Sequence, residues 1–270
     1  MRIEAIIILS VFAFFAVLEG LRTSFFHKPT QTRTDAWVEL IGSPVLLIIT
    51  QPLILLISYS LMSLAFPAAS GSWAGLPIIA QIALLLVFDD MMQYWWHRTS
   101  HSLPWLYNLH RAHHSGEYMS VRIVFRNNIF YYLTMPSIWF SGILIYLGLG
   151  PVYIVYVIVK QTVIIAAHSD VQWDRPLYKI KWLSPIMWLV ERTISTPATH
   201  SAHHGKHKAD GVTNYKGNFG NLLFFWDVLF CTAKITRRYP DEIGIENLPP
   251  IPAAVQLAWP IFRSEGSKIT

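Results

Sequence analysis

The sequence has little charge and almost no cysteine. Only 14% of its 270 residues are charged and 53% are hydrophobic, whereas about 25% of a typical soluble domain is charged. So many apolar side chains exceed what one water-facing domain of this length can bury, which excludes an ordinary soluble globular protein. The single cysteine, Cys231, excludes an intrachain disulfide and any zinc or iron–sulfur site built from cysteines. The chain is therefore expected to be solvated by lipid.

Several motifs are also missing. The chain lacks the HExxH pattern of zinc hydrolases and the Glu-x-x-His pairs of carboxylate di-iron bundles. No segment looks like a haem or flavin site, and no repeat, low-complexity tract or flexible linker divides the chain. A hydrolase of the HExxH type is therefore excluded, and any electrons that the protein needs must come from a separate donor.

Long apolar runs predict membrane spans, because a helix needs roughly 20 residues to cross the hydrocarbon core. The runs are Ile3–Leu18, Val45–Phe66, Leu76–Phe88, Ile129–Leu149 and Val152–Ala167. The short third run is expected to continue through Asp89 and Asp90 to an interfacial aromatic group that starts at Tyr94. Gln51–Pro52 predicts a kink in the second run. The last two runs, separated only by Gly150–Pro151, predict an antiparallel helical hairpin over residues 129–167.

The first apolar run has a competing interpretation. It begins directly after Met1 and Arg2, as a cleaved signal peptide would. However, the segment Leu18–Arg22 contains no clear small-x-small cleavage site, which favours an uncleaved span.

The basic residues indicate a topology. The net charge is +5, and 19 of the 21 Lys and Arg residues lie in segments 22–37, 97–128 and 169–270, whereas the linkers 67–75 and 148–151 hold none. By the positive-inside rule the three basic segments are cytosolic and the N-terminus lies outside. Every histidine then lies on the cytosolic side or at its boundary. The charge is thus a topology signal, and no nucleic-acid partner is expected.

Eleven histidines are the most informative residues. Nine of them form three clusters and one addition, namely His97 and His101, then His110, His113 and His114, then His200, His203 and His204, with His168 between the last two clusters. Helical positions i, i+3 and i+4 share one face, so each cluster presents its imidazoles in one direction. The remaining two, His27 and His207, are interpreted as ordinary polar residues.

Histidine is the commonest protein metal ligand, and eight or nine imidazoles exceed what one ion can use. The pattern therefore predicts two metal ions with positions open for oxygen. Neutral ligands leave the charge of two dications largely uncompensated, which suits a substrate whose reacting end is neutral. Carboxylates commonly orient such ligands, and Asp90 and Asp227 are the candidates. The alternative, that both are ordinary helix-end or interfacial charges, has equal weight.

Three further residues are candidates for a substrate cavity. Lys160 lies within the last span, where a charge is functional by default, and only eight residues before His168. It either lines the cavity or snorkels along its helix. The aromatic stretch that ends at Trp188 either roofs the site or is a plain amphipathic anchor. Asn218 is the third candidate.

The histidine clusters and their flanks resemble the fatty acid hydroxylase/sterol desaturase superfamily. The pattern runs Asp90…Tyr94-Trp95-Trp96-His97-Arg98-x-x-His101, His110-x-x-His113-His114, Thr196-Pro197-x-x-His200-x-x-His203-His204, Asn218-Phe219-Gly220…Trp226-Asp227…Thr232. The box spacing is nearer to the alkylglycerol monooxygenase and bacterial branch. The resemblance implies a membrane di-iron oxygenase that hydroxylates a lipid with O2 and two electrons. It makes the eight box histidines metal ligands, and His168 matches the family's additional histidine.

The resemblance also implies the cofactors and partners. The cofactors are two iron ions, which zinc can replace in a purified sample, with O2 as co-substrate. The substrate is a membrane lipid, such as a fatty acyl, sterol or ether lipid. The separate electron donor is a cytochrome b5, a ferredoxin or a reductase, and Lys206, Lys208, Arg237 and Arg238 would suit an acidic carrier. The location is the inner membrane of a bacterium or the endoplasmic reticulum of a eukaryote.

Three other functions stay open. The same site could desaturate the lipid instead of hydroxylating it. A membrane protein that binds or transports metal would place histidines inside the spans, whereas here the clusters follow the spans. A haem cytochrome with two histidine ligands would need single facing histidines on two spans.

The predicted fold class is all-α. We expect a multi-pass transmembrane helical bundle of about four to five spans, with a cytosolic helical cap that holds a histidine-rich di-metal site. The predicted regions are N-terminal spans at 1–88, a catalytic region at 89–232 that contains the hairpin, and a C-terminal tail at 233–270.

Overall fold

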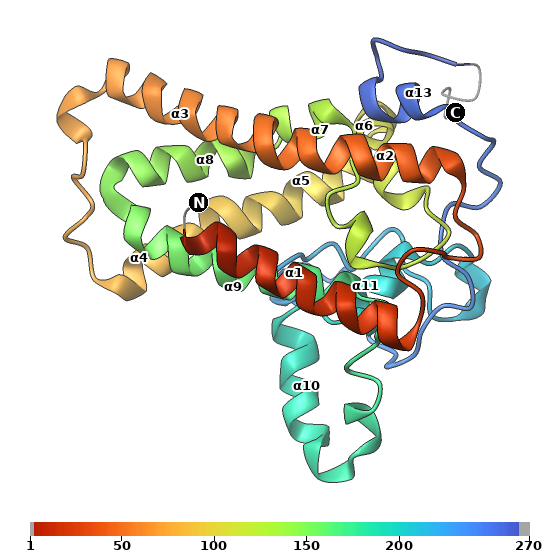
Figure 1. Cartoon of the computed structure of the whole chain (residues 1–270). Coiled ribbons are helices and arrows are strands. Elements are labelled where there is room, and N and C mark those ends of the chain that lie inside the picture. The colour runs from red at the N-terminus through yellow and green to blue at the C-terminus, as the bar shows by residue number, and fades with distance from the viewer. Residues whose placement is uncertain (1–2, 265–270) are drawn as a thin grey trace.

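A computed structural model describes residues 3–264, and within them the fold is all-helical, with two isolated bridges and no strand. Four helices are long and apolar enough to cross a membrane: Ile3–Arg22, Arg33–Ala65, Ile78–Ser100 and Pro136–His168. They lie side by side in Figure 1, with shorter helices gathered at one end. The prediction of a helical membrane bundle is confirmed.

The first two long helices differ in regularity. α1 (Ile3–Arg22) is a continuous α-helix that packs against the last one. The second comprises α2 (Arg33–Pro44), a π-helical turn (Val45–Thr50) and α3 (Gln51–Ala65). The kink expected at Gln51–Pro52 is instead this π-helical turn just before Pro52, which lets the helix continue although proline donates no backbone hydrogen bond.

The third long helix carries the first histidines. It comprises α4 (Ile78–Leu85), a π-helical turn (Leu86–Met91) and α5 (Met92–Ser100). As expected, it continues through Asp89 and Asp90, and both side chains are buried against other helices and loops rather than exposed to lipid.

The fourth long apolar segment, Pro136–His168, is a hairpin of two helices. Its arms are α8 (Pro136–Leu144), extended by a π-helical turn (Ile145–Leu149), and α9 (Gly150–His168). The chain reverses at Gly148, whose φ is +111° and whose Cα lies so close to Ala74 that an added Cβ would be 2.9 Å from it. Gly150–Pro151, expected to be the turn, forms the first turn of α9, where proline is favoured.

The first arm of the hairpin starts later than the expected Ile129. Asn128 caps the short helix α7 (Ile129–Leu133), and the chain is extended at Met135. Proline at 136 disfavours a helical conformation at the residue before it, so α7 and α8 are separate helices.

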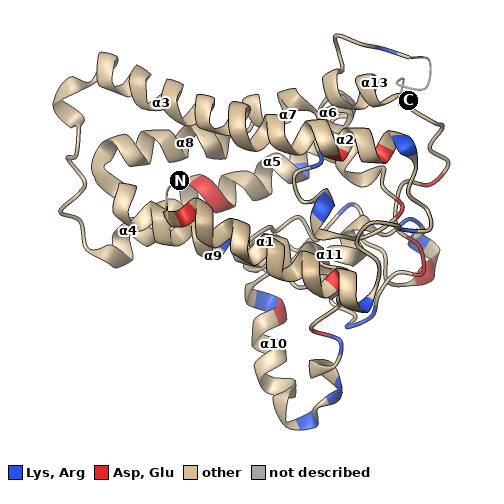
Figure 2. Cartoon of the chain, in the orientation of Figure 1, with Lys and Arg blue, Asp and Glu red and all other residues tan. Residues whose placement is uncertain are grey.

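Shorter elements form the cap over the end of the bundle. They are α6 (Pro104–His114), α10 (Ser184–Thr193), α11 (Pro197–His204), α12 (Phe225–Leu229), α13 (Ala253–Ala258) and 3-10 turns at 121–123, 177–179, 181–183 and 208–210, whereas a further 3-10 turn at 67–69 lies at the opposite end of the bundle, beside the hairpin turn. Figure 2 shows most of the charged residues around this cap and along α10, while α3 and α8 carry none. The α10 segment projects away from the bundle (Figure 1).

Candidate metal centre

Four helices supply the nine predicted ligands. α5 and the residue after it provide His97 and His101, α6 provides His110, His113 and His114, α9 ends at His168, and α11 provides His200, His203 and His204. The spacing of three and four residues puts the imidazoles of each helix on one face. The helices converge at the capped end of the bundle, and all nine predicted ligands lie together there.

Local signals fix where α11 starts. Thr196 caps the helix by accepting a hydrogen bond from the Thr199 backbone, the Thr199 side chain returns the bond, and Pro197 occupies the first turn. The buried carboxylate of Asp174 accepts a hydrogen bond from Ala198 N at 3.0 Å, where the helix dipole favours a negative charge. These contacts fix the first turn of the helix that carries the third cluster.

The nine imidazoles form two groups, within each of which the candidate ligand atoms lie within 4.8 Å of one another. The five-histidine group is His97, His101, His110, His114 and His203, and the four-histidine group is His113, His168, His200 and His204. In the part of the chain that the structure describes, no carboxylate or cysteine joins either group. The sequence predicts a histidine-rich site for two metal ions, and the described residues offer two adjacent groups of histidines.

Hydrogen bonds define the tautomer of several of these imidazoles. In the five-histidine group, Nδ1 of His97 donates to the Phe219 carbonyl oxygen at 2.7 Å, and Nδ1 of His203 donates to the Gly217 carbonyl oxygen at 2.8 Å. A carbonyl oxygen only accepts, so both protons are on Nδ1, and each Nε2 carries a lone pair. The two Nε2 atoms are nevertheless 3.0 Å apart.

The four-histidine group has the same arrangement. Nδ1 of His113 donates to the Ile123 carbonyl oxygen at 3.1 Å, and Nδ1 of His168 donates to the Ile164 carbonyl oxygen at 2.8 Å. Their Nε2 atoms face each other at 3.4 Å, and Nε2 of His200 lies 2.9 Å from that of His168. Both groups therefore aim unprotonated nitrogens at a shared point.

Two facing lone pairs repel each other unless a cation lies between them. A proton is disfavoured, because burial lowers the pKa of His113, His200 and His203 well below the ordinary value of 6.5. Nitrogens that bound the same ion at about 2.1 Å each would be no more than about 4.2 Å apart, and the paired Nε2 atoms are within this limit. His101 Nε2 and both ring nitrogens of His204 are buried without a hydrogen-bond partner among the described residues. The donor set therefore fits two metal ions.

The two predicted carboxylates contact a loop rather than a histidine. Asp227 accepts hydrogen bonds from Phe219 N at 2.8 Å, Gly220 N at 2.6 Å and the Thr232 hydroxyl at 2.6 Å. Asp90 accepts from Leu223 N at 3.1 Å and from Trp226 Nε1 at 2.7 Å. Burial raises the pKa of Asp227. Since the Phe219 carbonyl orients His97, both carboxylates act on the five-histidine group only through residues 217–223, here called the clamp loop.

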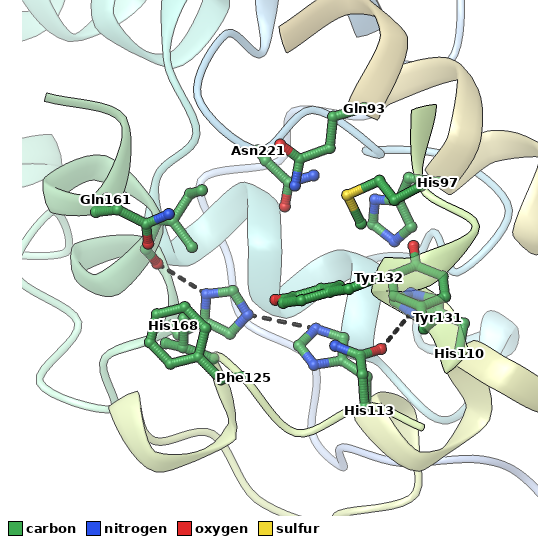
Figure 3. Close-up of a pocket in the computed structure, with 14 residues that line it drawn as sticks. Gln93, His97, His110, His113, Phe125, Tyr131, Tyr132, Gln161, His168 and Asn221 are labelled. Atoms are coloured by element: carbon green, nitrogen blue, oxygen red, sulfur yellow. Dashed lines mark hydrogen bonds between the residues drawn. The ribbon is translucent and has the colours of Figure 1, made fainter. Parts of the chain in front are cut away.

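A narrow cavity of about 50 Å³ opens on the histidines from inside the bundle. Figure 3 shows its lining, with Gln93, Gln161, Tyr132 and Asn221 beside His97, His110, His113 and His168. A second cavity of about 40 Å³ adjoins it deeper in the bundle and includes Lys160. The Lys160 side chain is buried and pairs with Asp89 at 2.8 Å, so it lines a cavity and does not snorkel to the surface.

The other two candidates for a substrate cavity lie elsewhere. Trp188 is 53% exposed on α10 and stacks with the guanidinium of Arg192, because α10 projects away from the bundle. Asn218 is buried and connects segments of the cap, with its amide donating to the Thr199 and Lys234 carbonyl oxygens. Neither residue is among those that line the two inner cavities, so the structure gives no support to placing them there.

The histidines are also reached from the polar side of the cap. His114 lies at the inner end of a cleft of about 290 Å³, which Tyr107, Lys206 and Tyr215 also line. The ring of Tyr107 lies 5.5 Å from that of His101, centroid to centroid. The centre therefore has one approach from the bundle interior and another from the charged surface.

Sequence reasoning missed several residues of the site. Gln93 and Gln161 line the inner cavity, Asn127 accepts a hydrogen bond from His110 at 3.0 Å, and Tyr131 stacks on His110. Helical spacing offered a signal for the glutamines, which precede His97 by four residues and His168 by seven. Asn127 lies in irregular chain after α6 and Tyr131 in the short helix α7, and neither had such a signal.

Fold and site define a class, a helical membrane protein with two buried histidine-only sites suited to metal ions. The chain belongs to the fatty acid hydroxylase family, which it matches over residues 82–232. It is 30% identical to alkylglycerol monooxygenase of Danio rerio over 53% of this chain and 28% of the relative. It is also 30% identical to the ornithine lipid hydroxylase OlsE of Rhizobium tropici, over 72% of this chain and 54% of the relative.

The human alkylglycerol monooxygenase is 27% identical over a similar stretch. The matched region thus covers between about a quarter and about half of the length of these relatives. No solved structure matches the chain significantly. The predicted superfamily, with its leaning towards the alkylglycerol monooxygenase and bacterial branch, is confirmed.

Proposed function

We propose that this protein is a membrane-bound, O2-dependent oxidoreductase that hydroxylates a lipid at a non-haem di-iron centre. The observation that carries the proposal is the pairing of unprotonated Nε2 atoms, His97 with His203 and His113 with His168. Family membership and two relatives named as a lipid hydroxylase and an alkylglycerol monooxygenase support it. Desaturation by the same centre has no structural observation in its favour.

Iron would be held by the two histidine groups and would supply the oxidation of a C–H bond to an alcohol, with O2 and two electrons. The chain's own residues provide orientation and exclusion of water. Carbonyl and amide oxygens fix the imidazole rings of His97, His110, His113, His168 and His203. Because the cluster is buried, bulk water is excluded from it.

The two approaches to the centre suggest separate routes for the reactants. The inner cavity lies among the long apolar helices, so a lipid could enter it from the bilayer without crossing water. The cleft at His114 opens to the charged side of the cap, where a soluble electron donor would dock. Tyr107, in that cleft and beside His101, lies between the surface and the centre.

We also propose that the protein is multi-pass and that the cap faces the cytosol. The ends of the long helices that meet the cap carry the basic segments, as the positive-inside rule requires of a cytosolic side (Figure 2). Residues 89–232 would then be the catalytic region, after N-terminal spans at 1–88 and before a tail at 233–270.

The test uses cells that produce the full chain, compared with cells that produce His200→Ala, grown under 18O2. The expected result is a membrane lipid that gains one labelled oxygen atom with the wild-type chain only. Purified wild-type protein should contain two iron ions per chain. Absence of any labelled lipid, in cells where the purified protein holds iron, would overturn the proposal.

A further inference from the structure

A buried ion pair lies halfway along the membrane-crossing helices. Lys160 Nζ and Asp89 Oδ2 are 2.8 Å apart, and each residue is only 5% exposed. Lys160 is the eleventh residue of α9, and Asp89 is the twelfth of the helix Ile78–Ser100. Charges inside a membrane are costly and usually have a function, and a buried pair is seldom retained for stability alone.

The pair borders a cavity that is unusually polar for its depth. The residues that line it include Gln51, Gln93, Ser137, Ser141 and Gln161. Among the described residues, Ser137 Oγ and Gln161 Oε1 have no hydrogen-bond partner, although Ser137 is only 1% exposed. Buried polar atoms without partners are destabilising. These side chains are therefore placed to bind a polar group from outside the chain.

The cavity continues to the metal centre. Gln93, Phe125, Tyr132, Met135 and Gln161 line both this cavity and the one at the histidines. Asp89, Gln93 and His97 are spaced four residues apart along one helix, so they follow one face of it. Eight helical residues separate Asp89 from His97 and Lys160 from His168, a distance of about 12 Å along each axis. We call this connected space the corridor.

We propose that the deep end of the corridor binds an uncharged hydrogen-bonding group of the lipid substrate, such as an amide, ester or hydroxyl. This inference rests on the proposed function and names its substrate class. Lys160 and Asp89 neutralise each other, so a charged ligand would have to break their pair. The Lys160 ammonium has three donors, of which Asp89 uses one, and the serine and glutamine side chains both donate and accept.

The geometry also sets where the lipid reacts. With its polar group at the ion pair and its chain along Gln93 and Gln161, the carbon beside the imidazoles lies about 12 Å from the polar group. The substrate is then an amphiphile that is oxidised at a fixed distance from a neutral polar group, rather than a hydrocarbon chain without one.

The test measures binding of tritiated 12-carbon probes to the full chain in nanodiscs, without O2 or reductant. The probes are dodecanamide, dodecane, dodecanoate and dodecylamine. Wild type is compared with the double variant Asp89→Leu/Lys160→Met, which replaces the pair with apolar side chains, and with Ser137→Ala. Ser58→Ala is the matched control, because Ser58 is a buried serine of α3 that bonds to the Ile54 and Leu55 carbonyl oxygens and lines neither cavity.

The expected result is that the double variant binds dodecanamide about 10-fold more weakly, with dodecane changed less than 2-fold, because only the hydrogen-bonding probe loses partners. Ser137→Ala should weaken dodecanamide about 5-fold, and Ser58→Ala should leave it unchanged. Comparing each probe between variants removes its partition into the bilayer.

Equal losses for dodecane and dodecanamide would overturn the proposal, as would a larger loss for dodecanoate or dodecylamine. If the double variant does not fold, the comparison of Ser137→Ala with Ser58→Ala decides between the same outcomes. Binding requires no turnover, so a chain that binds the amide as expected but never oxygenates a lipid would retain this site and overturn only the proposed function.

Discussion

The two histidine groups are held in different ways. In the five-histidine group, the orienting acceptors are the carbonyl oxygens of Gly217 and Phe219, both in the clamp loop, and the side chain of Asn127. In the four-histidine group they are the Ile164 carbonyl of α9 itself and the Ile123 carbonyl of a short helical turn. One group therefore depends on a loop and the other on regular backbone.

This difference predicts which substitutions each group tolerates. The clamp loop is fixed by side chains, chiefly Asp90 and Asp227, so substitutions far from the imidazoles can disturb the five-histidine group. The four-histidine group has fewer ligands, and its orienting carbonyls belong to helical backbone, so substitutions of Asp90 or Asp227 should disturb it less. The number of ligands matters too. When one histidine is removed, the five-histidine group keeps four ligands, whereas the four-histidine group keeps only three.

The largest effect is expected from removing a ligand of the smaller group. His200→Ala leaves three imidazoles there, and we expect activity to fall more than 100-fold, beyond the loss typical of a ligand's hydrogen-bond partner. Bound iron should fall from two ions per chain towards one, as measured by mass spectrometry of the metal. Since folding depends on the apolar helices, the yield in the membrane should be unchanged. Full iron content in this variant would contradict the assignment of His200.

A loop substitution should separate the two groups. Asp227→Asn replaces the acceptor of Phe219 N and Gly220 N with a side chain that accepts at only one atom. We expect the affinity of one iron ion to fall about 10- to 100-fold, the range for such outer contacts. Chelator titration should then show two phases in the variant. An equal loss of both ions would mean that the clamp loop supports the two groups alike.

Lowering the pH should affect the two histidine groups equally. Burial lowers the pKa of His110 and His114 in the five-histidine group and of His200 and His204 in the four-histidine group. Below pH 6.5 the unfolded chain binds protons that the folded chain does not, so the metal-free protein should lose stability as the pH falls from 7.5 to 5.5. Each such histidine contributes at most about 1.4 kcal/mol per pH unit to the slope of the unfolding free energy against pH. This loss of stability is measured by chemical unfolding, in detergent, of protein whose metal has been removed with a chelator.

Two matched variants provide the control for that measurement. His110→Ala and His200→Ala, one from each group, should each reduce the slope by a similar amount. A reduction for one variant alone would show that the groups titrate differently.

Much of this centre could be predicted from the sequence, because helical spacing alone puts His110, His113 and His114 on one face. The division into five and four could not, since it places His113 and His114, adjacent in sequence, in different groups. That division depends on how α6 is rotated against α11, which is a property of packing. The carbonyl oxygens that orient the imidazoles could not be predicted either, because every residue has a carbonyl oxygen.

The fold could be predicted from the sequence to a similar extent as the metal centre. Hydropathy located the long helices, but Pro136 rather than the apolar composition sets where α8 begins. Lys160 was recognisable as unusual, whereas its partner Asp89, 71 residues away, depends on two helices meeting. The role of Trp188 stayed open in the sequence, because aromatic composition does not specify whether a helix covers a site or projects from the molecule.

The smallest effect is expected from the spare ligand of the larger group. His101 is its least buried member and the only one that follows its helix rather than lying within it, at the C-cap of α5. Because four imidazoles remain in His101→Ala, as many as the other group has in the wild type, we expect both iron ions to stay bound and activity to fall about 10-fold or less. His203→Ala is the matched variant, since His203 belongs to the same group but is fully buried and bonded to the clamp loop. If His101→Ala instead loses one iron ion, as His200→Ala should, the fifth ligand is not spare, and the two groups differ only in how they are held.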